Sequence, residues 1–403
     1  MILGADWVVP VDGAPIRNGR VHVEGRDIAA LGEGGPADLE YPGGVILPGL
    51  VNAHSHLEYA RMSGFGDGKA FTPWIEEHIS RKAALDHPAD SLVQAIEGAH
   101  VCLAGGVTTV ADCSYMGTTA QASVEAGLRA IVYLEGFSIW EGLGDRIRTG
   151  LDAMPTSGLV TGGVSPHAPF TVTLEDYAMM IGIARERGLP VATHMLESQR
   201  EHLHLDHFAG LLGPDVVAVH GVYLTPQDIA LAAAADVPVI HCPRSNALLG
   251  CGIAPVTEML DAGLRVGIGT DSPASAMAFD LWDEMRCAVM MARARAARAD
   301  AMSAATVLEL ATLRGAQAIG LGQRTGSLTP GKAADLTVLD LSDTPFLPWD
   351  DPVVASVYGG NPQRVAMTMV DGEIRYDRAS PLPDGESATR VRAKMLAATA
   401  PGT

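Results

Sequence analysis

Two histidines separated by one residue, His54 and His56, follow directly after the apolar run ILPGLVNA. Side chains two residues apart in an extended chain point to the same side, so both imidazoles can bind a single metal ion. Such a pair on its own is weak support, because it arises by chance and is about as often structural. Its position at the end of an apolar run favours a pair of metal ligands.

Three further groups end later apolar runs: His194 in LPVATHMLE, His220 in VVAVHG and Asp271 in LRVGIGTDS. Histidines and a carboxylate around one centre suit zinc, iron or manganese and leave one position open for water. Any one of these histidines could be an ordinary core or loop residue. That interpretation would have to hold separately at four run ends. The pattern therefore predicts one divalent ion, with zinc preferred over iron or manganese.

The elements that must position these groups are short apolar runs, each followed by a polar loop and a longer helical stretch. Strands that alternate with helices indicate parallel βαβ units, and eight units within roughly 230 residues predict a closed (β/α)8 TIM-type barrel. An open doubly wound sheet is the alternative, which the lack of a GxGxxG after the first strand disfavours. Barrel strands end at one mouth, where the chemistry takes place. The eight runs are GVILPGLVNAH, GVTTVADC, RAIVYLEGF, LVTGGVSPH, LPVATHMLE, VVAVHG, VPVIHCPRSN and LRVGIGTDS.

Both ends of the chain carry short apolar runs separated by Asp-Gly and Asn-Gly pairs, which are typical of β-hairpins. Neither end is large enough to fold well alone, so we expect the two ends to form one small β-sandwich together. The predicted domains are this sandwich from residues 1–47 and 325–380, the barrel from residues 48–324, and a tail from residues 381–403.

The chain has 403 residues and a formal net charge of -19. A surface this acidic argues against nucleic acid or an anionic membrane as a partner and leaves a small-molecule substrate open. Five cysteines without a CxxC pair indicate a reduced, cytoplasmic setting. We expect no signal peptide, because the N-terminus lacks a basic start. We also expect no membrane span, because no uncharged stretch is long enough.

Seven motifs taken together resemble the amidohydrolase superfamily, and the resemblance covers about residues 1 to 375. They are most similar to the branch that contains adenosine-type, methylthioadenosine/S-adenosylhomocysteine and aminodeoxyfutalosine deaminases. The ordered set is highly specific for the superfamily and less specific for a substrate. Homodimers are common among such proteins, which makes a homodimer an open expectation. The motifs are LPGLVNAHSHLE, SPHAPF, THMLE, VAVHG, HCPRSN, GCGIAPV and GIGTDS.

The resemblance implies a role for each group at the predicted mouth. His220, with Asp271, would accept the proton of the attacking water, whose pKa the metal lowers toward neutrality. Hydroxide would attack the ring carbon that bears the amino group, protonated Glu197 would neutralise the adjacent ring nitrogen, and ammonia would leave. His167, in SPHAPF, would contact the substrate. The implied metal ligands are His54, His56, His194 and Asp271.

The number of metal ions is a separate question. Two-metal relatives of this architecture bridge their ions with a carboxylated lysine from the middle of the barrel. No lysine occurs between Lys82 and Lys332, which favours one ion. A bridging glutamate stays open, and Glu135, at the end of the third run, is the candidate. A structural or substrate-facing role for Glu135 is the preferred alternative.

Three residues are candidates for binding the substrate. Arg244 in CPRSN is similar to aminodeoxyfutalosine deaminases, whose substrate carries a carboxylate that an arginine can pair bidentately. Bracing of the loop after the seventh strand is an equal alternative for Arg244. Glu58 could bind a ribose hydroxyl, and Trp74 could stack on a base or cap the barrel. CPRSN makes aminodeoxyfutalosine the leading substrate and menaquinone biosynthesis the expected context.

The predicted function is the hydrolytic deamination of an adenine-type nucleoside. Within hydrolysis, the alternatives are a methylthioadenosine/S-adenosylhomocysteine or adenosine deaminase and a guanine- or triazine-type amidohydrolase. The missing bridging lysine disfavours a cyclic-amide hydrolase. A metal-binding scaffold on an inactive barrel is disfavoured because every expected ligand and the proton carrier are present.

Overall fold

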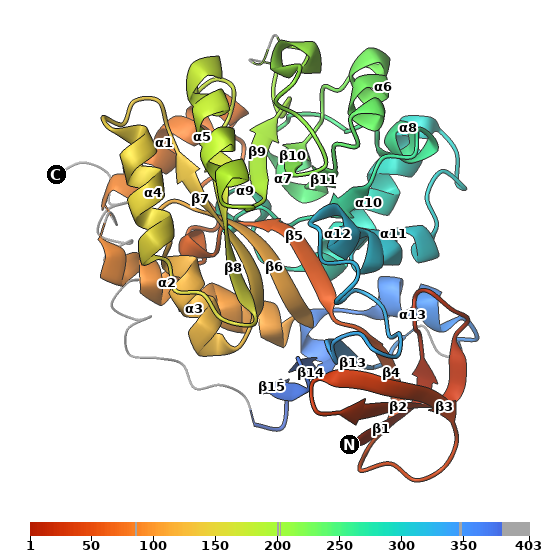
Figure 1. The fold of residues 1–403 in the computed structure, drawn as a ribbon. Helices are drawn as coiled ribbons and strands as arrows, with labels where there is room; N and C mark the ends of the chain where they lie inside the picture. The colour runs from red at the N-terminus through yellow and green to blue at the C-terminus, as the bar shows by residue number, and fades with distance from the viewer. Residues whose placement is uncertain (85–86, 200, 202, 346–348, 381–403) are drawn as a thin grey trace, which may run out of the picture.

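The eight apolar runs supply eight neighbouring parallel strands, which follow one another in chain order from β5 to β12 (Figure 1). Helices cover the outside of this sheet, and its strands are buried, as expected for a parallel sheet. The sheet closes where the backbone N–H of Asp271 donates to the carbonyl of His54 at 3.0 Å. The predicted barrel is therefore confirmed. Its strands are β5 (Leu50–Ser55), β6 (Val107–Ser114), β7 (Arg129–Gly136), β8 (Val160–Pro166), β9 (Val191–Met195), β10 (Val216–His220), β11 (Val239–His241) and β12 (Val266–Ile268).

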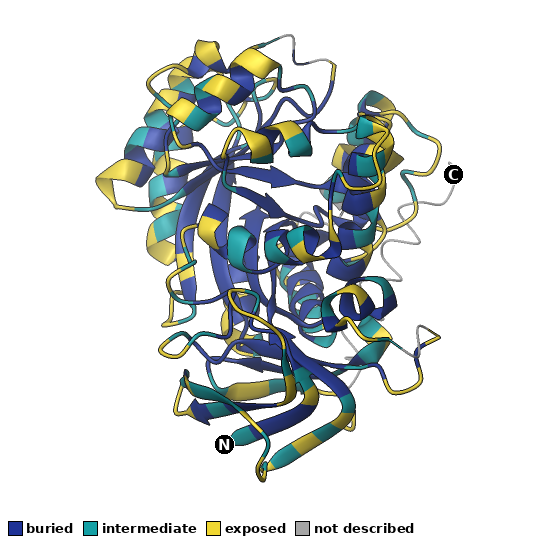
Figure 2. Cartoon of the chain, turned by 90° about the vertical axis from the view of Figure 1, so that its right-hand side faces the viewer, coloured by how far each residue is buried: buried dark blue, intermediate teal, exposed yellow. Residues whose placement is uncertain are grey.

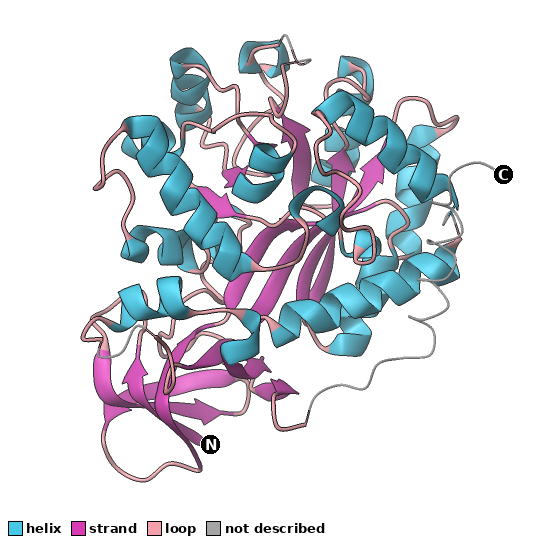
Figure 3. Cartoon of the chain, turned by 180° about the vertical axis from the view of Figure 1, so that it is seen from behind, coloured by secondary structure: helices cyan, strands magenta, loops and turns pink. Residues whose placement is uncertain are grey.

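The structure is a computed structural model that describes residues 1–84, 87–199, 201, 203–345 and 349–380. The tail predicted at residues 381–403 lies outside these ranges. Figure 3 shows the helices arranged around the barrel strands, and Figure 2 shows buried strands inside helices that are exposed on their outer faces. Within the described ranges, no helix has the length and apolarity needed to cross a bilayer.

The helices alternate with the barrel strands, apart from a few short ones in the loops and one in the C-terminal segment. They are α1 (Phe71–Ala84), α2 (Pro88–Ala104), α3 (Thr118–Ala126), α4 (Leu143–Ala153), α5 (Leu174–Glu186), α6 (Pro226–Ala234), α7 (Pro243–Leu248), α8 (Val256–Asp261), α9 (Pro273–Ala276), α10 (Leu281–Ala296), α11 (Ala304–Leu310), α12 (Leu313–Ala318) and α13 (Pro352–Gly359), with 3-10 turns η1 (Leu57–Tyr59), η2 (Leu205–Phe208) and η3 (Pro362–Arg364).

Side-chain caps fix where the helices that leave the barrel mouth begin. Thr225 accepts a hydrogen bond from the backbone N–H of Asp228 at 3.2 Å, and the Asp228 carboxylate accepts one from the N–H of Thr225 at 3.0 Å. This reciprocal pair satisfies N–H groups that the first turn of α6 leaves open. Pro226 occupies the first helical position, where its missing N–H costs nothing. The loop after β10, which carries His220, is therefore short and fixed at its far end.

The two ends of the chain share one seven-stranded sheet below the barrel (Figure 1). Strand β4 from the N-terminal segment pairs antiparallel with β13 from the C-terminal segment, with Leu47 opposite Thr337. The expected joint module from both termini is therefore confirmed. The strand order is β15 (Glu373–Asp377), β14 (Val365–Val370), β13 (Leu336–Asp340), β4 (Leu39–Pro48), β1 (Ile2–Val8), β2 (Ile16–Glu24) and β3 (Asp27–Glu33).

Gly49 divides the first apolar run between the two sheets. The run GVILPGLVNAH is one of the eight runs predicted as barrel strands, and the predicted domain boundary after residue 47 falls within it. The structure places the first half of the run in β4 and the second half in β5. A Cβ at Gly49 would lie 2.1 Å from the Thr108 side chain, so no larger residue fits without a shift. Periodicity alone does not show such a break, because both halves are apolar and fully buried.

A buried network of charges joins the base of the barrel to the terminal sheet. The guanidinium of Arg129, at the start of β7, donates to Asp335 at 2.7 Å and to Asp371 at 3.1 Å. Arg324 also donates to Asp371 at 2.8 Å. Because each buried charge has an opposite partner, the network fixes the sheet against the barrel without leaving an isolated ion.

Candidate active site

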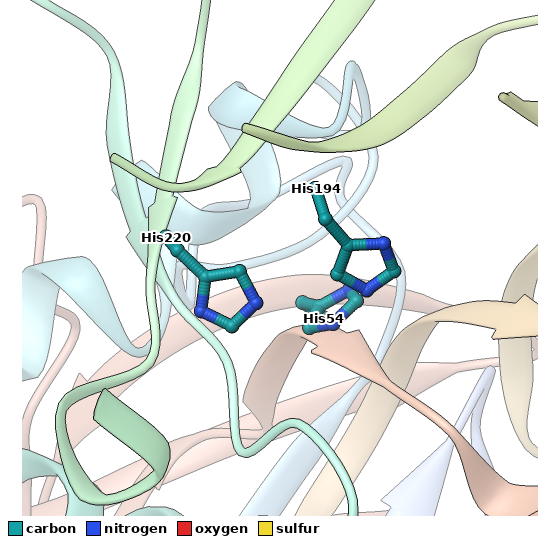
Figure 4. A group of neighbouring side chains, drawn as sticks. All are labelled: His54, His194 and His220. Carbon is teal, nitrogen blue, oxygen red and sulfur yellow. The ribbon is translucent and has the colours of Figure 1, made fainter. Parts of the chain in front are cut away.

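Side chains from the ends of four strands meet at the mouth of the barrel. His54 and His56 lie on or just after β5, His194 lies on β9, His220 ends β10, and Asp271 follows β12. Their nitrogen and oxygen atoms lie within 4.8 Å of one another in sets of three, such as His54, His56 and Asp271. Figure 4 shows the rings of His54, His194 and His220 turned toward one another. The structure thus brings together all the residues that the sequence predicted as ligands.

The distances between these atoms suit a metal ion better than direct hydrogen bonds. Nε2 of His56 lies 3.3 Å from Nε2 of His194 and 3.5 Å from Oδ1 of Asp271. Nε2 of His54 is buried and has no hydrogen-bond partner within the described part of the chain. A buried polar atom without a partner is costly, and a cation at the centre would give it one. The donor set of imidazoles and a carboxylate fits a divalent ion such as zinc.

Backbone carbonyls hold two of the imidazoles in the orientation that a metal ligand needs. Nδ1 of His56 donates to the carbonyl of Cys113 at 2.7 Å, and Nδ1 of His194 donates to the carbonyl of His167 at 2.8 Å. A proton held on Nδ1 leaves the Nε2 lone pair free for an ion. Burial lowers the pKa of His56 to about 4 and also lowers the pKa of His194, so both rings stay neutral. These carbonyls carry no signal in the sequence.

Asp271 is held by three donors. Its Oδ2 accepts from the hydroxyls of Ser245 at 2.7 Å and Ser275 at 2.8 Å, and its Oδ1 accepts from the N–H of Ser272 at 2.7 Å. Burial opposes the charge of this carboxylate, but the nearby His56 and the serine hydrogen bond keep the pKa of Asp271 below its usual value. Ser245 stands in the quoted motif CPRSN, yet sequence reasoning weighed only the arginine there.

Glu197 and His220 lie side by side above this cluster. Oε1 of Glu197 is 3.7 Å from Nε2 of His220, and both side chains are buried. Burial, with Asp271 and Glu201 nearby, raises the pKa of Glu197 well above its usual value, which favours the protonated form of this carboxyl. Burial lowers the pKa of His220 to about 3, so its ring is neutral. One group can therefore donate a proton and the other can accept one.

The backbone is strained at the strand ends that carry these groups. His220 has a φ of 76°, Asp271 has a φ of 58° and Leu196, before Glu197, has a φ of 53°. Left-handed backbone is unfavourable for residues other than glycine and gathers at functional sites, where the surrounding structure enforces it. Sequence patterns do not reveal this strain, because none of these three residues is a glycine, the residue type that most strongly indicates a positive φ.

Glu135 lies beside the ligands, at the end of β7. One of its oxygens lies within 4.8 Å of ligand atoms of His56 and His194. Oε1 of Glu135 has no hydrogen-bond partner within the ranges that the structure describes. Burial raises the pKa of Glu135 to about 8, although the charge of Lys82 opposes this. The carboxyl thus faces the same space as the ligands, and its role there stays a prediction.

His167 stands at the rim of the site. Its Nδ1 lies 2.8 Å from the hydroxyl of Thr171, and its ring stacks on Phe137 with centroids 4.6 Å apart. The ring centroid is 4.8 Å from that of His194, and the residue is half-buried. His167 therefore lies where a substrate could reach it, and the contact itself stays a prediction.

Arg244 points to a buried partner instead of the mouth. Its Nε donates to Oε1 of Glu284 at 2.6 Å, and its Nη2 donates to the carbonyl of Ala278 at 2.6 Å. Glu284 is fully buried on α10, forty residues away along the chain. A substrate carboxylate would have to compete with this pair. The geometry therefore favours the alternative that Arg244 braces the loop after the seventh strand.

We expect Arg244→Met to lower the free energy of unfolding by about 3–5 kcal/mol, because it leaves the buried Glu284 carboxylate without its cation. Denaturant unfolding measures this loss. The double variant Arg244→Met/Glu284→Met should recover much of it, whereas Arg148→Met, which breaks an exposed pair with Glu186, should change stability by less than about 1 kcal/mol. Unchanged unfolding together with a raised KM for a carboxylate substrate would restore the substrate-binding role.

Glu58 is also engaged within the protein. Its carboxylate accepts hydrogen bonds from the hydroxyl of Ser114 at 2.5 Å and from the backbone N–H groups of Tyr115, Met116 and Thr118. The Thr118 hydroxyl donates to it as well, at 2.8 Å. These bonds hold the loop between β6 and α3. The ribose-binding role expected for Glu58 would require breaking them, so the structure indicates a structural carboxylate.

Trp74 lies in a cluster of aromatic rings on α1. Its Nε1 donates to the carbonyl of Ala274 at 3.0 Å, and its ring stacks on His78 with centroids 5.3 Å apart. The first loop of the barrel is thereby tied to the last, as the capping alternative requires. His78, which the sequence analysis does not single out, is buried, and its Nδ1 has no partner among the described residues. The four-residue spacing from Trp74 on a helix was the signal that could have found it.

Comparison with known proteins gives consistent matches over nearly the whole chain. Residues 45–375 match the model of the amidohydrolase family. The chain is 32% identical over 393 residues to a 5-methylthioadenosine/S-adenosylhomocysteine deaminase of Halobacterium salinarum, with 92% of this chain and 91% of that protein covered. A 5'-deoxyadenosine deaminase of Methanosarcina acetivorans is also 32% identical over 393 residues, with 91% and 90% covered. A solved adenosine deaminase from Xanthomonas campestris with bound zinc has a TM-score of 0.89 and 28% identity, with 98% and 97% covered.

Proposed function

Because this chain belongs to the amidohydrolase family, we propose that it is a metal-dependent hydrolase that removes the amino group of an adenine-type nucleoside as ammonia. The observation that carries the proposal is the buried Glu197 carboxyl beside His220 and Asp271, next to a cluster of ligand atoms. Attack on an aromatic ring carbon needs a proton for the adjacent ring nitrogen, and a protonated carboxyl supplies it. A scaffold protein would have no use for such an acid.

Three side chains carry the proton transfers of the proposed reaction. His54, His56, His194 and Asp271 would hold a divalent ion, which would supply a water whose pKa is lowered toward neutrality. The Asp271 carboxylate and Nε2 of neutral His220 accept the proton of the attacking water. The side-chain amide of Asn246 lies 3.0 Å from Nδ1 of His220 and holds that ring in place. With the amide turned so that Oδ1, which has no other partner among the described residues, faces Nδ1, the ring carries its hydrogen on Nδ1 and Nε2 is free to accept a proton. Glu197 donates its proton to the ring nitrogen next to the attacked carbon. The proton taken from water then passes to the amino group, which leaves as ammonia, and the hydroxyl group of the tetrahedral carbon returns a proton to Glu197 as the carbonyl forms.

The substrate class follows from what the relatives share. Methylthioadenosine, S-adenosylhomocysteine and 5'-deoxyadenosine, named for two of the relatives, have the adenine ring in common and differ at the 5' position. The proposal therefore concerns the adenine ring. Aminodeoxyfutalosine stays within this class. It was preferred over the other substrates because Arg244 could pair with its carboxylate, but Glu284 already pairs with that arginine. A role in menaquinone biosynthesis depends on the same substrate.

Ammonia release by the zinc-loaded protein tests the proposal. The panel holds aminodeoxyfutalosine, methylthioadenosine, S-adenosylhomocysteine, 5'-deoxyadenosine, adenosine, guanine and cytosine. We expect fast release from at least one adenine nucleoside and slow release from guanine and cytosine. Fast release from guanine alone would mean that the substrate carries another heterocycle in place of adenine. No release from any compound, with zinc bound, would contradict a deaminase of this class.

A further inference from the structure

A short loop after β9 brings Glu197 over the ligand cluster. The chain leaves the strand at Met195 and turns sharply at Leu196, whose φ is 53°. This left-handed turn is unfavourable for a leucine, so other contacts must hold the loop in this conformation. The hydrogen bonds of its backbone N–H groups supply these contacts.

Three consecutive N–H groups of this loop converge on one carboxylate, that of Glu201. The N–H of Leu196 donates to Oε2 at 2.7 Å, and the N–H groups of Glu197 and Ser198 donate to Oε1 at 2.9 and 3.3 Å. The Glu201 N–H in turn donates to the carbonyl of Ser198 at 3.1 Å. Glu201 is only 6% exposed, so water does not replace these bonds easily. Buried N–H groups need acceptors, and a charged acceptor binds them more strongly than a neutral one.

We infer that Glu201 is a positioning residue that holds Glu197 in the place from which it donates its proton. Glu201 contacts the backbone of residues 196–198 and is not within hydrogen-bond distance of the other site residues described above. Its effect on the reaction therefore passes through Glu197, which its contacts with the backbone hold in place. The inference rests on the proposed function for its effect on turnover, and on the contacts alone for its effect on the loop.

Loss of the carboxylate should affect the chemical step more than substrate binding. Without its three acceptor contacts, the loop relaxes away from the left-handed turn at Leu196, and Glu197 spends less time beside His220. The metal ligands come from other strands or precede the loop, so metal content should not change. A residue that only stabilised the fold would lower the melting temperature without lowering kcat of the folded protein.

The test compares Glu201→Ala and Glu201→Gln with the control Glu186→Gln, which removes an exposed carboxylate paired with Arg148 on the outer surface. We expect kcat for ammonia release to fall about 100-fold or more in the alanine variant, since a positioned acid contributes about 10²–10⁴-fold. KM should change less than about threefold, and zinc content should stay as in the wild type. The glutamine variant should be intermediate, because its amide oxygen can still accept part of the set. The control should match the wild type.

Hydrogen–deuterium exchange on the zinc-loaded full chain supplies a readout that does not depend on turnover. The amides of Leu196, Glu197 and Ser198 should exchange faster in both Glu201 variants than in the wild type or the control. Unchanged exchange would overturn the claim that Glu201 holds the loop, even if the wild type deaminates none of the compounds tested. Faster exchange with unchanged kcat in the glutamine variant, which is the one expected to fold normally, would overturn the positioning role.

Discussion

Glu197→Gln is expected to lower kcat for ammonia release by about 10²–10⁴-fold while the metal stays bound. The amide keeps the size of the side chain and its place beside His220, but it cannot donate the acidic proton that the ring nitrogen needs. Because burial raises the pKa of Glu197, the wild type should lose activity only as pH rises above that raised value. The glutamine variant should lack this alkaline decline.

Steady-state rates and zinc content, measured on the same preparations, check this prediction. Glu186→Gln, on the exposed surface of α5, is the matched control and should behave as the wild type. Near-normal turnover of Glu197→Gln would show that the proton comes from another group. Loss of zinc together with turnover would instead place Glu197 among the residues that hold the ion.

The second large effect concerns the metal ligands themselves. His194→Ala should abolish both zinc binding and ammonia release, because the ring supplies one of the converging ligand atoms and contacts His56 at 3.3 Å. His22→Ala, in the terminal sheet, should change neither. Elemental analysis and the ammonia assay give the two readouts. Retained zinc in the His194 variant would mean that the remaining groups suffice to bind it.

Removal of the ion by a chelator should also destabilise the folded protein. Nε2 of His54 is then left buried without a partner, and the stabilisation by a bound ligand is lost. This stabilisation amounts to about 2.7 kcal/mol when the free ion is at 100 times its Kd. Thermal unfolding with and without zinc measures it. An unchanged melting temperature would contradict a site that the ion completes.

The parts of the molecule that sequence predicted well are those whose chemistry recurs along the chain. Each barrel strand falls on one of the eight apolar runs, although β11 and β12 are only three residues long. His54, His194 and Asp271 stand at run ends that the barrel must bring to one mouth. Local pattern and global fold agree there, which is why the ligands could be named before the structure. The joint terminal sheet follows in the same way, because neither end could bury its apolar face alone.

The roles that sequence left open concern side chains whose partners lie far away or on the backbone. Arg244 was judged without Glu284, forty residues later, and the two alternatives for its role differ only in that contact. Glu58 was judged without the N–H groups of the β6–α3 loop, which no side-chain pattern encodes. The predicted boundary after residue 47 falls beside the break at Gly49, but an apolar run reads the same whether it forms one strand or two, so the pattern does not fix the exact residue.

The joint terminal sheet has a consequence for synthesis on the ribosome. Strand β4 ends at Pro48, and its antiparallel partner β13 begins only at Leu336. At about 5–20 residues per second, the roughly 290 residues between them take on the order of 15–60 s to translate. During that time one edge of β4 has no partner, and unpaired edges favour wrong association. The barrel has time to form first, so the last strands of the nascent chain complete a sheet that its first strands began.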